Sequence, residues 1–126
     1  MSLKVLIVDD EPSVLESTRL LLTEFGYHVI TRSDHRDTAA TVASEKPDVV
    51  LHDVRMPGLD IRRLLDSLRL DPATASVPVI LFSASLDLVD VQRQTHARGI
   101  LEKPFQPSEL LGALEAAKAG APGVAR

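Results

Sequence analysis

Five short apolar runs alternate along the chain with longer segments of helical period, and this alternation restricts the fold more than any other feature. Most of the runs are rich in Val, Ile and Leu, as expected for strands buried on both faces. They cover Leu3 to Val8, His28 to Thr31, Asp48 to His52, Val77 to Phe82 and Gly99 to Glu102. Because parallel neighbouring strands need a crossover connection, we predict a three-layer α/β sandwich built on a parallel sheet.

The segments between these runs carry apolar residues at the i, i+3, i+4, i+7 spacing of one helix face. The first stripe comprises Val14, Leu15, Thr18, Leu21, Leu22 and Phe25, and the weaker second one Ala39, Val42 and Ala43. Later stripes comprise Ile61, Leu64, Leu65 and Leu68, then a mixed segment from about 86 to 96, then Leu110, Ala113, Leu114 and Ala117. Residues 119–126 are rich in Gly, Ala and Pro, so we predict one domain over 1–118 and a flexible C-terminal tail.

Composition excludes several classes of function. The 126 residues include no cysteine, which rules out disulfides and a cysteine-bound zinc. The formal net charge of −4 gives no basis for a nucleic-acid-binding face. No apolar run approaches the ~20 residues that span a bilayer, and the first residues lack a secretory signal. We therefore expect a cytoplasmic protein that contacts neither nucleic acid nor a membrane directly.

Polar residues stand at the carboxyl ends of the predicted strands, which is the edge where open parallel sheets bind ligands. They are Asp9, Asp10 and Glu11 after the first run, His52 and Asp53 at the third, Ser83 (followed by Ala84) at the fourth, and Lys103 (followed by Pro104) at the fifth. Three aspartates at one edge repel each other unless they share a cation. Hard oxygen ligands on a wet rim suit Mg²⁺, so the pattern predicts a magnesium site.

Each of these residues also has a simpler interpretation when it is taken alone. Asp9 or Glu11 could equally be a helix cap or a turn former, and Lys103 could be a solvated loop lysine. On this topology, however, Lys103 points at the acidic edge, where an ammonium can pair with a carboxylate and with a phosphoryl group. Ser83 could be merely a small residue at a strand end, although its hydroxyl can donate to a phosphoryl oxygen. The joint pattern favours a site that handles phosphate.

Four segments agree, in order and in spacing, with the motifs of one known family. They are LKVLIVDDEP (Leu3 to Pro12), LHDVRMPGLD (Leu51 to Asp60), PVILFSAS (Pro78 to Ser85) and EKPF (Glu102 to Phe105). Together they resemble the receiver domain of two-component response regulators, and the resemblance covers nearly the whole chain. Each motif alone is weak, whereas four motifs combined with five strands are specific. The resemblance implies a flavodoxin-like, doubly wound sheet with strand order 2-1-3-4-5.

The resemblance also implies what the acidic residues do. Asp53 would accept a phosphoryl group from a phosphohistidine on a sensor histidine kinase or a histidine phosphotransfer protein, or from a small phosphodonor. Asp10 and Asp53 would bind Mg²⁺ together with the main-chain carbonyl of Arg55, while Asp9 would orient metal-bound water. Phosphoryl transfer depends mainly on in-line placement and charge neutralisation, which such a site supplies.

Further residues are assigned by the same resemblance. Lys103 would pair with Asp53 and then with the phosphoryl oxygen, and Ser83 would move toward the phosphate. The family's aromatic switch residue corresponds here to Ile100, so a conformational output has to use another route. Ile61 stands where the family has glycine after the aspartate, which indicates either that the third helix starts sooner or that the loop turns differently, with Gly58 providing the conformational freedom.

Two other expectations concern neighbours of Asp53. Arg55 has a long cationic side chain that could reach the site, and we hypothesise that Arg55 and Ser85 set the phosphoryl lifetime by controlling water access. The four histidines show no metal-ligand spacing. His52 precedes Asp53 on a strand and should therefore point to the opposite face of the sheet as a packing residue.

The sequence thus predicts a phosphorylation-controlled signalling switch that is no enzyme beyond its own phosphorylation and dephosphorylation, and that acts by docking onto an unidentified protein target. Two enzyme or cofactor classes compete with this interpretation. A haloacid-dehalogenase-type phosphatase carries a second aspartate where this chain has Arg55, and a flavin binder needs a phosphate-cradling loop where Asp9, Asp10 and Glu11 stand. A receiver that is never phosphorylated and serves only as a docking surface also stays open.

Overall fold

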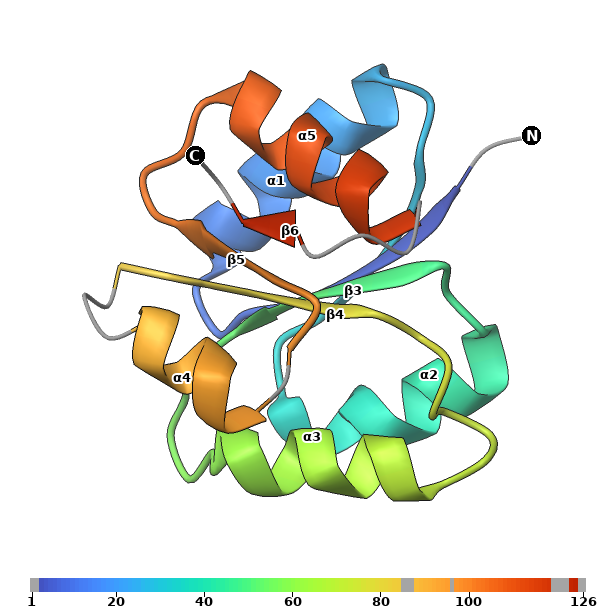
Figure 1. Ribbon diagram of the computed structural model, residues 1–126. Coiled ribbons are helices and arrows are strands. Elements are labelled where there is room, and N and C mark those ends of the chain that lie inside the picture. The colour runs from blue at the N-terminus through green and yellow to red at the C-terminus, as the bar shows by residue number, and fades with distance from the viewer. Residues whose placement is uncertain (1–2, 85–87, 96, 119–122, 125–126) are drawn as a thin grey trace.

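The computed structural model describes residues 3–84, 88–95, 97–118 and 123–124, and it shows a parallel sheet with helices on both faces (Figure 1). The strands are β1 (Lys4–Val8), β2 (His28–Arg32), β3 (Val49–Asp53), β4 (Val79–Ser83), β5 (Gly99–Glu102) and β6 (Gly123–Val124). The helices are α1 (Pro12–Glu24), α2 (Thr38–Glu45), α3 (Ile61–Leu70), α4 (Leu88–Thr95) and α5 (Pro107–Lys118), with a 3₁₀ turn, η1 (His35–Asp37), before α2. The predicted three-layer α/β class is confirmed.

The order of the strands in the sheet is β2-β1-β3-β4-β5-β6, and every pair is parallel. The predicted order of the first five strands is confirmed. The sixth was not predicted, because two residues, Gly123 and Val124, are too short to show an alternating pattern. They pair with Gly99 and Ile100 within the segment predicted as a flexible tail. The rest of that tail lies outside the described residues.

β3 and β4 each extend one residue further than their apolar runs. Asp53 pairs with Phe82, and Ser83 pairs with Glu102, so both polar residues belong to the backbone ladder of the sheet. The hydrophobic pattern ends earlier because it reports side chains and not backbone hydrogen bonds. The consequence for the site is that Asp53 and Ser83 stand on the last rung of ordered strands, where the backbone holds them in place.

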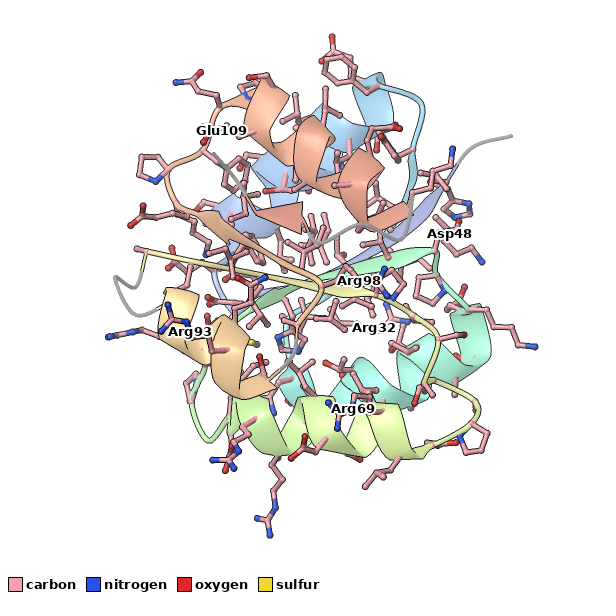
Figure 2. All side chains as sticks on the ribbon, viewed as in Figure 1. Arg32, Asp48, Arg69, Arg93, Arg98 and Glu109 are labelled. Carbon is pink, nitrogen blue, oxygen red and sulfur yellow. The ribbon has the colours of Figure 1, made fainter. Side chains whose placement is uncertain are left out.

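Two apolar clusters hold the layers together, one on each face of the sheet. Helices α1 and α5 cover one face, and α2, α3 and α4 cover the other (Figure 1). Figure 2 shows Glu109 on α5 on the first side, and Arg69 on α3 and Arg93 on α4 on the second. Phe82 is fully buried under α5, so its ring ties the site end of β4 to the core.

Two of the predicted helix stripes need correction. Phe25 is 54% exposed, because α1 ends at Glu24 and Gly26, with φ of +90°, turns the chain away. Ala39 is exposed, whereas Thr38 and Thr41 are buried beside Val42. The hydropathy pattern misses this face of α2 because threonine counts as polar, although its methyl group packs well in a core.

The turn that contains Gly58 and the cap provided by Asp60 together set the start of the third helix. α3 starts at Ile61, directly after Asp60, whose carboxylate accepts a hydrogen bond from the Arg63 N–H at 3.1 Å and so caps the helix. Gly58 supplies the left-handed conformation that the preceding turn needs, with φ of +73°. The loop after Asp53 is therefore short and is anchored at both ends.

Candidate functional site

Asp9, Asp10 and Asp53 meet at the carboxyl edge of the sheet. β1 lies beside β3, with Val8 opposite His52, so the residues that follow in each strand become neighbours. One carboxylate oxygen from each aspartate lies within 4.8 Å of the other two. Asp9 is fully buried and Asp53 is 4% exposed, while Asp10 faces solvent. These three oxygens could hold a metal ion, and an all-oxygen donor set with one open side fits Mg²⁺.

Lys103 supplies the positive charge next to these carboxylates. Its Nζ lies 2.6 Å from Asp9 Oδ2 and 3.8 Å from Asp53 Oδ1, and its side chain is only 15% exposed. The ammonium also lies 4.5 Å from the centre of the Phe82 ring, which adds a cation–π attraction. The family resemblance implied a pair with Asp53, whereas the shorter contact is with Asp9. The two contacts together hold the ammonium between the two buried carboxylates.

Backbone amides orient the Asp53 carboxylate. Its Oδ1 accepts hydrogen bonds from the N–H groups of Val54 at 2.9 Å and Arg55 at 3.4 Å. Burial and, after it, the negative charge of Asp9 raise the pKa of Asp53, against the opposing effects of Lys103 and the two amides. An ionised Asp53 is therefore destabilised in the metal-free protein. A cation at this position would relieve that unfavourable charge.

This raised pKa predicts how stability depends on pH. A carboxyl group whose pKa is higher in the folded state destabilises the fold as pH rises from its unfolded value, about 4, through its folded value. In EDTA, we expect the Asp53→Asn variant to gain melting temperature relative to wild type as pH increases over this range. The two proteins should converge at acid pH, where Asp53 is neutral in both states. A difference in melting temperature that is the same at every pH would contradict this cause.

Ser83 lies at the edge of the sheet that carries the site, whereas Ile100 lies in the hydrophobic core. Ser83 is buried on the last rung of β4, and its carbonyl accepts the Lys103 N–H at 2.9 Å. Ile100 is only 7% exposed and packs in the cluster on the α3 and α4 side, paired with Leu81 across the ladder. Arg55 is exposed beside the site, and Ser85 lies outside the described residues.

His52 is a fully buried packing residue, as predicted, and it lies on the face opposite Asp53. Its Nε2 lies 2.9 Å from the Thr38 hydroxyl and its Nδ1 lies 2.7 Å from the Asp53 carbonyl oxygen. Burial lowers the pKa of His52 to about 4, so the ring is neutral at pH 7. The sequence did not reveal Thr38 as its partner, because nothing in the pattern connects two residues fourteen positions apart.

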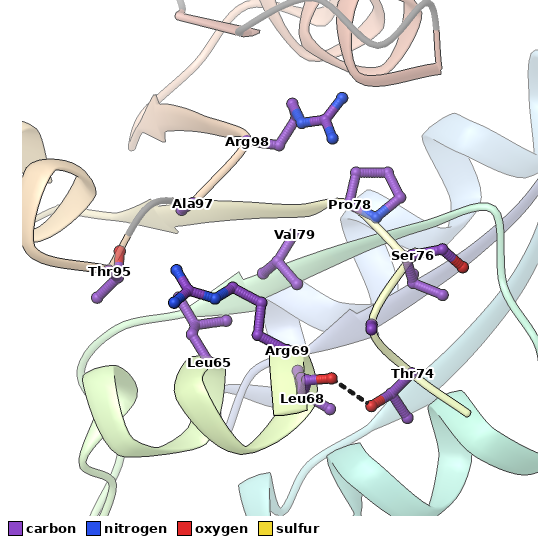
Figure 3. A pocket seen from close by; sticks show the side chains of 12 residues that line it. Leu65, Leu68, Arg69, Thr74, Ser76, Pro78, Val79, Thr95, Ala97 and Arg98 are labelled. Atoms are coloured by element: carbon purple, nitrogen blue, oxygen red, sulfur yellow. Dashed lines mark hydrogen bonds between the residues drawn. The ribbon is translucent and has the colours of Figure 1, made fainter. Parts of the chain in front are cut away.

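Cavities lie at both edges of the sheet. One of about 130 Å³ is found where β4 and β5 begin, at the opposite edge of the sheet. Figure 3 shows Leu68 and Arg69 of α3 on one side of it and Arg98 on another, with the Thr74 hydroxyl donating to the Leu68 carbonyl at 2.6 Å. A second, of about 440 Å³, is mostly apolar and lies beside Lys103, between α1 and the loop after β5. This cavity, and another of about 510 Å³ that Asp10 lines, lie at the edge of the sheet where a molecule approaches the aspartates.

The comparison with known proteins agrees with the geometry of the site. Residues 5–115 match the model of the response regulator receiver domain. Protein PilH of Pseudomonas aeruginosa is 36% identical over 120 residues, which cover 93% of this chain and 98% of PilH. The chain therefore belongs to the receiver-domain family of two-component response regulators.

Solved structures give the same picture. The chemotaxis response regulator CheY4 of Vibrio cholerae has 29% identity and a TM-score of 0.81, covering 91% of this chain and 98% of CheY4. The receiver domain of a sensor histidine kinase from Pseudomonas aeruginosa has 25% identity and a TM-score of 0.83, covering 96% of this chain and 100% of that domain. That structure holds a magnesium ion coordinated in its active-site cleft.

These findings define the class of function. The chain is a regulatory phosphoacceptor domain and a phosphorelay signalling switch, and domains of this family are phosphorylated by histidine kinases. It spans about half the length of several other curated relatives, which are named as transcriptional or DNA-binding regulators. No helix within the described ranges is long and apolar enough to cross a membrane.

Proposed function

We propose that Asp53 accepts the phosphoryl group and that Asp10, Asp53 and the Arg55 carbonyl bind Mg²⁺, with Asp9 orienting metal-bound water. The observation that carries the proposal is the cluster of three carboxylates beside one partly buried lysine. A bound Mg²⁺ supplies charge neutralisation for both the acceptor and the phosphoryl oxygens. Asp10 is the exposed member of the cluster, so it is the first carboxylate that an ion from solvent meets.

Each residue of the site has its own role in the transfer of the phosphoryl group. One Asp53 carboxylate oxygen attacks phosphorus, the new P–O bond forms, and the bond from phosphorus to the donor's imidazole nitrogen or leaving oxygen breaks. The amides of Val54 and Arg55 hold Oδ1, which leaves Oδ2 to act as nucleophile. Lys103 stabilises the charge that develops on the phosphoryl group. The resulting acyl phosphate keeps a net negative charge next to Asp9, so it must be balanced by the ammonium and the metal.

The signalling role follows from what the phosphoryl group can attract. The Ser83 hydroxyl stands one strand away from Asp53, where it can donate to a phosphoryl oxygen after a short movement. Ile100 sits in the core and offers no swinging ring, so we infer that phosphorylation acts by shifting the packing of β4, β5 and their helices. The phosphorylated domain would act in the cytoplasm on a protein target.

A surface of this chain next to the site is suited to bind the protein that donates the phosphoryl group. The mostly apolar cavity beside Lys103 is lined by Val14 and Leu21 from α1 and by Pro104 and Phe105 from the loop after β5. A phosphohistidine-bearing helix of a sensor kinase or a phosphotransfer protein can pack here while its imidazole faces Asp53. We infer that α1 and this loop select the phosphodonor protein.

The experiment that tests the proposal uses the wild-type chain. Incubation with acetyl phosphate and Mg²⁺ should add one phosphoryl group by intact mass, and treatment with base should remove it. Borohydride reduction followed by peptide mapping should locate the modification at Asp53. The same incubation in EDTA should give little product. A protein that stays unmodified at every concentration of acetyl phosphate and by every candidate kinase would instead be a receiver that serves only as a docking surface.

Arg55 gives a separate prediction about the lifetime of the phosphoryl group. Its side chain is exposed at the rim, two residues after the acceptor, where it can restrict the approach of water. We therefore expect Arg55→Ala to raise the rate of dephosphorylation severalfold while the rate of phosphorylation by acetyl phosphate stays within about twofold. Arg62→Ala, at an exposed arginine on α3, is the matched control. Equal dephosphorylation rates in wild type and Arg55→Ala would remove Arg55 from this role.

A further inference from the structure

The peptide group between Asp53 and Val54 is held at both of its ends. Its carbonyl oxygen lies 2.7 Å from Nδ1 of His52, and its N–H donates to Asp53 Oδ1 at 2.9 Å. A peptide group is planar, so fixing the direction of the carbonyl also fixes the direction of the N–H. The imidazole of His52 therefore acts, through one peptide plane, on the carboxylate that receives the phosphoryl group.

The imidazole is itself fixed by α2. A carbonyl oxygen can only accept, so Nδ1 must carry the ring proton and donate it to the Asp53 carbonyl. Nε2 of the neutral ring then accepts from the hydroxyl of Thr38, 2.9 Å away. Both His52 and Thr38 are fully buried, so no water competes for these bonds. Two hydrogen bonds in series thus connect the first residue of α2 to the backbone of Asp53.

We propose that His52 is a positioning residue for the phosphoacceptor and that Thr38 holds it in the required tautomer. This inference rests on the proposed role of Asp53. His52 cannot touch the phosphoryl group, because its ring lies on the opposite face of the sheet. Its effect is on the direction of Asp53 Oδ1, which receives the Val54 amide and lies 3.8 Å from Lys103 Nζ. Loss of the Nδ1 donor would free the peptide plane and let the carboxylate turn away from its productive orientation.

A packing role alone makes a different prediction, and two substitutions separate the two roles. The side-chain amide of asparagine places an N–H near the position of Nδ1, so His52→Asn keeps a donor for the Asp53 carbonyl. Glutamine reaches the position of Nε2, so His52→Gln keeps a partner for Thr38 and lacks the donor to the carbonyl. Glutamine preserves more of the buried volume, so a residue that only fills space should tolerate glutamine better than asparagine.

The measurement is the initial rate of phosphorylation by acetyl phosphate at saturating Mg²⁺. We expect His52→Asn to stay within about twofold of wild type, and His52→Gln to fall about fivefold, the factor that corresponds to one hydrogen bond of average strength. The affinity for Mg²⁺, measured by titration calorimetry, should change less than the rate in both variants. Equal rates in the two variants, or a slower asparagine variant, would overturn the proposal.

Melting curves report whether the His52→Asn and His52→Gln variants fold. If either variant does not fold, an NMR measurement on the wild-type protein still tests the proposal. Long-range ¹H–¹⁵N NMR of the histidine ring should show the proton of His52 on Nδ1, and a proton on Nε2 would refute the inference. Thr38→Val, which removes the hydroxyl and keeps the shape, should lower the rate and broaden or shift the ring signals. Failure of the underlying proposal looks different, because the phosphoryl group would then map to a residue other than Asp53 in the wild-type chain.

Discussion

Replacing Asp53 with asparagine is expected to abolish phosphorylation by acetyl phosphate and by a cognate histidine kinase. The amide oxygen carries no formal charge and is a poor nucleophile, so no acyl phosphate forms at this position. The substitution is nearly isosteric, and the hydrogen bonds from the Val54 and Arg55 amides to the side-chain oxygen can be retained. Intact mass spectrometry after incubation with acetyl phosphate and Mg²⁺ measures the result directly.

Measuring the stability of the Asp53→Asn variant distinguishes loss of the nucleophile from loss of the fold. Burial and the Asp9 charge make an ionised Asp53 unfavourable, so the asparagine variant should be folded and more stable than wild type in EDTA at pH 7. Asp37→Asn is the matched control, because Asp37 is exposed and its side chain makes no capping hydrogen bond. A phosphoryl group that appears with unchanged yield in Asp53→Asn would exclude Asp53 as the acceptor.

Much of the fold could be predicted because hydrophobic burial leaves a strong periodic signal in the sequence. β3 and β4 are buried on both faces, so their apolar runs were visible, and Asp53 and Ser83 were correctly expected at the carboxyl ends of these strands. β6 could not be predicted, since a two-residue strand contributes backbone hydrogen bonds and hardly any pattern. The exposure of Phe25 depends on where α1 ends, which a helical period does not determine.

The members of the candidate site could be predicted because parallel strands deliver their carboxyl ends to one edge. This rule places Asp9, Asp10, Asp53 and Lys103 together without any coordinates. Which carboxylate Lys103 approaches most closely could not be predicted, because the choice depends on side-chain geometry after the backbone is set. The pairing of Thr38 with His52 is a similar case, in which tertiary packing alone brings α2 against β3.

Replacing Lys103 with methionine is expected to lower the rate of phosphorylation by acetyl phosphate about 10²-fold, the loss typical of removing one preorganised charge-stabilising group. Methionine keeps most of the length and the apolar contact with Phe82 but removes the ammonium that lies 2.6 Å from Asp9. Without that charge, Asp9 and Asp53 repel each other in a buried environment. The free energy of unfolding in EDTA should fall by up to about 3 kcal/mol, as for other buried pairs that lose one partner.

The response to Mg²⁺ distinguishes loss of a charge from damage to the fold. Lys103 and Mg²⁺ both neutralise Asp9 and Asp53, so removing the ammonium should strengthen Mg²⁺ binding while phosphorylation slows. A variant damaged in its fold would lose both affinity and rate. Lys118→Met, at an exposed lysine that ends α5, should leave both quantities unchanged.

Lys103→Arg tests whether charge alone is sufficient. Arginine restores the positive charge, but its guanidinium is larger and planar and does not fit the space between two carboxylates and the Phe82 ring that the ammonium occupies. We therefore expect both the stability and the phosphorylation rate that are lost in the methionine variant to return only in part. Full recovery of the phosphorylation rate in the Lys103→Arg variant would mean that the exact position of the charge is unimportant. A rate in the methionine variant equal to that of wild type would show that the carboxylates and Mg²⁺ suffice, and that the lysine serves only to balance Asp9 before the metal binds.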